Sequence, residues 1–133
     1  MSRSVEVKRP SFPTATKGVA LKEEPQKIWQ PLCGDSDHWR AGIYSPSTSN
    51  LNQIQELEKH SCPELFLLIE GELTLALVED GKLKELKLEK EKPVFVDTWH
   101  SGYCPNGPHS GRAFIVERDE FITEYKTVKE LTN

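Results

Sequence analysis

The feature that most constrains the fold is an alternating run of residues that ends in a tight-turn signal. Leucines stand at every second position from 73 to 77, with Thr, Ala and Val between and after them. Alternation with a period of two is typical of a β-strand, because successive side chains point to opposite faces. The Asp80-Gly81 dipeptide follows, and both residues tolerate the positive φ angles of a type I′ turn. We therefore predict an antiparallel hairpin whose return strand, rich in Lys and Glu, leaves one face in water.

Further short strands are predicted before and after this hairpin, with turn-forming residues between them. The strand-like segments are 39–44, 65–69, 93–97 and 112–118. Many short strands separated by regular turns indicate a β-sandwich or barrel. A chain of 133 residues can bury one modest core, so we expect a single all-β domain over residues 36–133. Residues 51–59 fit either a helical turn or a loop, and residues 120–133 either a strand or a short helix.

Residues 1–35 differ from the rest of the chain. They contain four prolines and show little periodicity. We expect an N-terminal extended arm that is partly docked on the domain, because burying Trp29 is favourable.

Composition and charge disfavour several classes of protein. The net charge is −4 and no long basic run occurs, so we expect no nucleic-acid partner. No segment approaches the ~20 apolar residues of a membrane-spanning helix, so we expect no membrane partner. The N-terminus lacks an apolar stretch typical of a signal peptide, which predicts a cytoplasmic protein. The three cysteines form no CxxC pair, and we interpret them as free thiols.

The segment from Glu58 to Glu64 contains the candidate functional residues. At strand spacing, residues 58, 60, 62 and 64 would point to one side of a sheet, which gathers two carboxylates, an imidazole and a thiol. Such a row inside a barrel is costly unless the groups bind a cation or one another. His100 directly follows the segment 93–99, and antiparallel pairing of neighbouring strands could bring it opposite His60.

This pattern resembles the two motifs of the cupin superfamily. His60-x3-Glu64-x6-Gly71 is similar to the second half of the motif G-x5-H-x-H-x3,4-E-x6-G, with Glu58 at the position of the first histidine. Residues 94–100 resemble the strand and turn that deliver the histidine of the second motif. The glycine, proline and asparagine of that motif are absent, since other residues stand there: Asp97, Phe95 and Cys104. The resemblance covers residues 38–118.

The resemblance implies a small cupin-type β-barrel, a jelly-roll-like double sheet, with a metal site at its centre. The ligands would be His60, Glu64 and His100, with Glu58 as the fourth. Imidazole and carboxylate ligands together suit a divalent transition metal such as Mn, Fe, Zn or Ni. In the plainer alternative, the histidines are merely hydrogen-bonded in a polar barrel mouth and the carboxylates are solvated.

A softer ligand set is a further alternative. Cys62 and Cys104 could join the two histidines, and thiolates would then favour zinc. The spacing of these four residues matches no standard zinc motif.

Three functions remain open from the sequence. The first is a metal-dependent enzyme of the isomerase, lyase or dioxygenase type that acts on a small polar molecule in the barrel. The second is a non-catalytic protein that binds or senses a small molecule, and the third is a structural or assembly role for the arm. We also predict a homodimer, because a small domain with apolar strands and an arm without its own core favours assembly.

Overall fold

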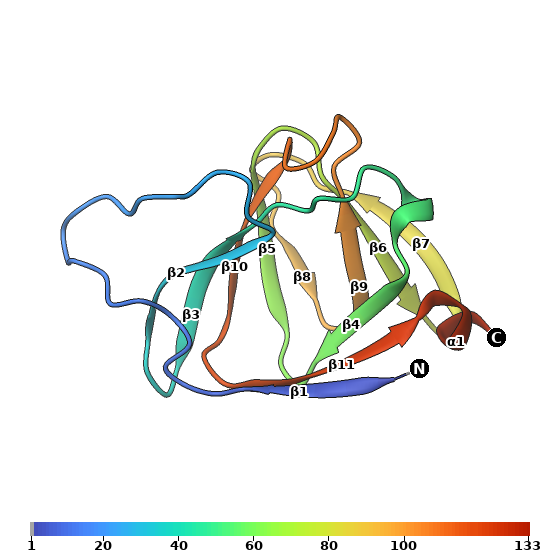
Figure 1. The fold of residues 1–133 in the computed structure, drawn as a ribbon, viewed down its shortest axis with the longest axis horizontal. Helices are drawn as coiled ribbons and strands as arrows, with labels where there is room; N and C mark the ends of the chain where they lie inside the picture. The colour runs from blue at the N-terminus through green and yellow to red at the C-terminus, as the bar shows by residue number, and fades with distance from the viewer. Residues whose placement is uncertain (1) are drawn as a thin grey trace.

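The computed structural model describes residues 2–133, which form two antiparallel β-sheets (Figure 1). The six-stranded sheet has the order β1-β11-β4-β9-β6-β7, and the five-stranded sheet has the order β2-β3-β10-β5-β8. The elements are β1 (Arg3–Val7), β2 (Trp29–Asp35), β3 (Trp39–Tyr44), β4 (Glu56–His60), β5 (Glu64–Glu70), β6 (Thr74–Glu79), β7 (Lys82–Lys87), β8 (Val94–Val96), β9 (Trp99–Tyr103), β10 (Arg112–Arg118), β11 (Phe121–Thr127) and α1 (Val128–Thr132). The predicted all-β double sheet is confirmed.

The predicted hairpin is the connection between β6 and β7. Asp80 has a φ of 53° and Gly81 a φ of 74°, the left-handed conformation that a type I′ turn requires. The charged strand β7 lies at the edge of the six-stranded sheet, where lysines oppose pairing with another chain.

The two ambiguous segments each contain two kinds of structure. Residues 51–59 hold a single 3₁₀ turn, Leu51–Gln53, followed by the start of β4. The C-terminal segment forms β11 and then α1, whose start is fixed by a capping box between Thr127 and Glu130.

The main core lies between the two sheets. It is built from the inward-facing residues of the central strands, for example Phe66 on β5, Leu75 on β6 and Ile115 on β10. A second, smaller cluster lies on the outer side of the six-stranded sheet, where Val128 and Leu131 of α1 cover Val78. None of the helices in the described chain has the length and apolar character that a membrane span requires.

The segment predicted to be an arm takes part in both sheets. β1 pairs with β11, and β2 pairs with β3, so each end of the arm contributes an edge strand. The chain between β1 and β2 loops out beyond the five-stranded sheet (Figure 1). The division of the chain into an arm and a domain at residue 35 stays a prediction.

Candidate metal centre

The four residues expected to bind a metal come from three strands in two sheets. Glu58 and His60 lie on β4, and His100 lies on β9, directly opposite Glu58. Glu64 begins β5 in the other sheet. The expectation of one continuous strand face from 58 to 64 was therefore wrong, because the chain leaves β4 after His60 and crosses to the facing sheet.

These side chains nevertheless converge on one point. The Oε1 oxygen of Glu64 lies 2.9 Å from Nε2 of His60 and 2.9 Å from Nε2 of His100. The Oε1 oxygen of Glu58 lies 3.5 Å and 3.7 Å from the same two nitrogens. Ligand atoms at about 2.1 Å from a tetrahedral ion stand about 3.4 Å apart, so these four separations suit one ion. Glu58 and Glu64 do not share a group of ligand atoms that all lie within 4.8 Å of one another in the described residues.

Glu64 supplies the test of whether a cation fits. Its side chain is only 4% exposed. Although Oε1 lies close to both imidazoles, neither contact has hydrogen-bond geometry, so this buried oxygen has no hydrogen-bond partner. A buried carboxylate needs positive charge beside it, which the protonated imidazoles supply in the metal-free protein and which a cation between the three groups would supply instead. The donor set therefore fits a divalent metal ion.

The second nitrogen of each imidazole is held by a neighbour. Nδ1 of His100 donates to the carbonyl oxygen of Thr98 at 2.8 Å. Nδ1 of His60 lies 2.7 Å from Oγ1 of Thr123. Such contacts set the tautomer and direct the Nε2 lone pair, as histidine ligands of metals require.

The charges of the cluster reinforce one another. Burial lowers the pKa of His60, but the carboxylates of Glu58 and Glu64 raise it more, to about 10. Burial also lowers the pKa of His100, and Glu64 again outweighs it, so that pKa is raised. Burial raises the pKa of Glu64, yet the two histidines hold it well below its usual range. In the metal-free protein the cluster is thus a network of ion pairs.

The cluster lines a pocket of about 300 Å³ in the barrel. Much of its wall is aromatic: Trp29, Tyr44, Phe66, Phe121 and Tyr125. Val7 and Trp29 come from the two ends of the arm, so the arm completes the wall. A larger cavity of about 480 Å³ lies against residues 13–32, but no histidine lines it. The barrel pocket is therefore the candidate site.

The pocket also contains two charged residues that were not predicted from the sequence, Arg40 and Glu117. They are register partners on β3 and β10, and both side chains are buried. Burial and the negative charge of Glu64 raise the pKa of Glu117 to about 7, while Arg40 opposes this rise. The alternation of β10 could have identified Glu117, because it shares the inward face with Ala113 and Ile115.

The thiols and the fourth histidine lie outside this cluster. In the described residues, two sets of side chains could hold an ion, Glu58–His60–His100 and His60–Glu64–Glu117, and neither contains a cysteine. Cys104 instead exchanges contacts with the backbone of Gly111. His109 is bonded through Nδ1 to the carbonyl oxygen of Ser45.

Solved structures resemble this arrangement of strands. No protein-family model and no curated protein matches the chain. A cupin-2 domain-containing protein from Shewanella frigidimarina has a TM-score of 0.50 at 15% identity, with 69% of this chain and 82% of that one covered. The chain has a cupin fold.

Two further solved structures, one of Fe(II) HppE and one of hydroxypropylphosphonic acid epoxidase, share this fold. The HppE structure has a TM-score of 0.55 at 14% identity and covers 79% of this chain. Hydroxypropylphosphonic acid epoxidase from S. wedmorenis, in complex with fosfomycin, has a TM-score of 0.52 at 17% identity and covers 68%. The chain described here spans only 62% and 49% of the lengths of the chains in these two structures. At such identities the likeness concerns the cupin fold alone.

Proposed function

We propose that this cupin binds one divalent transition metal through His60, Glu64 and His100, with Glu58 as the fourth ligand, and presents it to a small polar molecule. The observation that carries the proposal is the convergence of three buried groups, since Oε1 of Glu64 lies 2.9 Å from Nε2 of His60 and 2.9 Å from Nε2 of His100. The donor set suits Mn, Fe, Zn or Ni. HppE structures with Fe(II) and with Co(II) support the view that this fold accommodates such ions.

A bound ion would act as a Lewis acid and as a template for oxygen atoms of the bound molecule. The residues of the chain prepare the site for it. Thr98 and Thr123 fix the orientation of the two imidazoles. The aromatic wall offers apolar surface to the rest of the molecule. Glu58, 35% exposed, is the most accessible of the four ligands. An enzyme and a non-catalytic binding protein would both use this pocket. Only an enzyme would convert the bound molecule into a product, so an assay for product formation distinguishes the two functions.

Metal analysis of purified variants tests the proposal. We expect stoichiometric metal in the wild-type protein and a large loss in His100→Ala. His109→Ala is the matched control, because His109 lies outside the cluster, and it should retain the metal. Equal metal content in the wild type and His100→Ala would contradict the proposed site. Glu58→Gln should weaken binding measurably if Glu58 is the fourth ligand.

We also infer that the protein forms a homodimer. Phe95 on β8 is 70% exposed, and it lies directly opposite Leu65 of β5, which is also exposed. Ile69 extends this apolar surface on the outer side of the five-stranded sheet. A second copy of the chain that covered this surface would remove the three side chains from water.

A further inference from the structure

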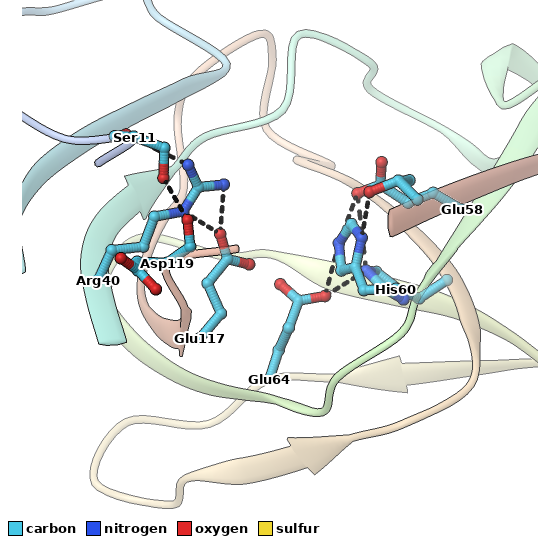
Figure 2. Close-up of polar contacts among 9 residues, drawn as sticks. Ser11, Arg40, Glu58, His60, Glu64, Glu117 and Asp119 are labelled. Atoms are coloured by element: carbon cyan, nitrogen blue, oxygen red, sulfur yellow. Dashed lines mark hydrogen bonds and ion pairs between the residues drawn. The ribbon is translucent and has the colours of Figure 1, made fainter. Parts of the chain in front are cut away.

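A third carboxylate lies beside the proposed metal ligands. Glu117 on β10 and Glu64 on β5 both point into the barrel from neighbouring strands. His60, Glu64 and Glu117 each offer a ligand atom, and these atoms lie within 4.8 Å of one another. Figure 2 shows the carboxylates of Glu64 and Glu117 next to each other, between Arg40 and His60.

Arg40 holds Glu117 by only one of its two oxygens. Nε of Arg40 donates to Oε2 of Glu117 at 2.6 Å, and Nη2 lies 2.5 Å from that same oxygen. A forked arginine–carboxylate pair would use both oxygens. In Figure 2 the other oxygen of Glu117 is directed toward Glu64. Arg40 itself is fixed by the carbonyl of Ser11 and lies over the ring of Phe121.

The net negative charge of the pocket can be balanced by one divalent cation. Glu58, Glu64 and Glu117 contribute three negative charges when ionised, and Arg40 contributes one positive charge. With both histidines neutral, as ligands of a metal must be, the net charge is therefore −2. Two carboxylates that face each other in a buried pocket repel unless they share a cation or a proton. One divalent ion would neutralise the whole pocket.

We propose that Glu117 is a further carboxylate ligand of the ion that His60 and Glu64 bind, and that Arg40 is the residue that positions it. This inference rests on the proposed function and adds a ligand outside the two cupin motifs. A further carboxylate ligand also narrows the choice among the four candidate metals. Counted with the ligands proposed above, Glu117 would give the ion five protein ligands, three of them carboxylates, a set that favours manganese or iron over tetrahedral zinc.

Manganese titration of variants tests this role. Calorimetry on Glu117→Gln should show an affinity about 10- to 100-fold below that of the wild type. Glu117→Asp keeps the charge and the pairing with Arg40 but has a shorter reach, and it should also bind more weakly. Glu124→Gln, an identical change at an exposed position of β11, is the control and should bind as the wild type does.

The cobalt spectrum of the wild-type protein gives an independent readout that needs no variant. Five-coordinate Co²⁺ absorbs visible light weakly, whereas tetrahedral Co²⁺ absorbs strongly, so we expect a weak spectrum. A strong tetrahedral spectrum would overturn the role of Glu117, and so would wild-type manganese affinity in both Glu117 variants. In either case the site of His60, Glu64 and His100 would stand. If the wild-type protein bound no metal, both the site and this inference would be wrong.

Discussion

Thr123 is the residue whose contact fixes the orientation of His60. Its hydroxyl lies 2.7 Å from Nδ1, and valine has the same shape without the hydroxyl. We expect Thr123→Val to weaken metal binding about 10-fold, because loss of such a contact frees the imidazole to reorient. Titration calorimetry would measure this, with Thr14→Val on the exposed arm as the control. Unchanged affinity would mean that the ring of Phe121, packed 4.7 Å from that of His60, fixes it alone.

The protonation of His60 and Glu64 predicts how stability depends on pH. The pKa of His60 rises from 6.5 to about 10 on folding, so its stabilising effect is complete below pH 6.5 and is lost as the pH rises toward 10. The pKa of Glu64 falls on folding from 4.5, so its effect is complete above pH 4.5 and is lost in acid. The cluster therefore stabilises the metal-free protein most between pH 4.5 and 6.5.

Thermal melts of the metal-free protein measure this dependence. The melting temperature should fall between pH 6.5 and pH 10, and His60→Gln should reduce the fall. Metal affinity should rise over the same range, because the ion binds only neutral imidazole and displaces its proton. A melting temperature that fell equally in the wild type and His60→Gln would contradict the assignment.

Among the elements, the turns after β5 and β6 allow a matched comparison. Gly71 and Gly81 both have left-handed φ angles, 69° and 74°. A Cβ at Gly81 would meet nothing closer than 3.9 Å, whereas a Cβ at Gly71 would lie 2.1 Å from the carbonyl oxygen of Ser110. Gly81→Ala should cost about 1 kcal/mol of unfolding free energy, from the conformation alone. Gly71→Ala should cost about 2–5 kcal/mol, since overpacking adds to the strain. Urea unfolding measures both losses of free energy. If the two variants lost the same amount, the backbone at Ser110 would have to move aside to accommodate the new Cβ.

For the whole molecule, the dimer is the prediction that a surface substitution can test. Phe95→Glu places a charge on the apolar surface of the five-stranded sheet, and we expect it to yield monomers. Ile122→Glu, at a 49% exposed position of β11 in the other sheet, should leave the dimer intact. Light scattering at micromolar concentration measures both. A wild-type protein that remained monomeric there would refute the dimer.

The sequence by itself determined the class of fold and most of the candidate ligands. Alternation reports which side chains share a face, and the Asp80-Gly81 turn is specified by local φ preferences, so both follow from neighbouring residues. The resemblance of His60, Glu64, Gly71 and His100 to the cupin motifs narrowed that class to a cupin barrel. These signals are local, which is why they can be read without knowing which strands pair.

Only the tertiary structure decided which strands face one another. His60 and Glu64 meet because the chain crosses between sheets after β4, and Glu117 joins them from β10, more than fifty residues later in the chain. Arg40 pairs with Glu117 through the register of β3 and β10. The arm enters both sheets through pairing with β11 and β3. Alternation assigns a residue to a face but not to a neighbouring strand, because strand pairing depends on long-range packing of the whole core.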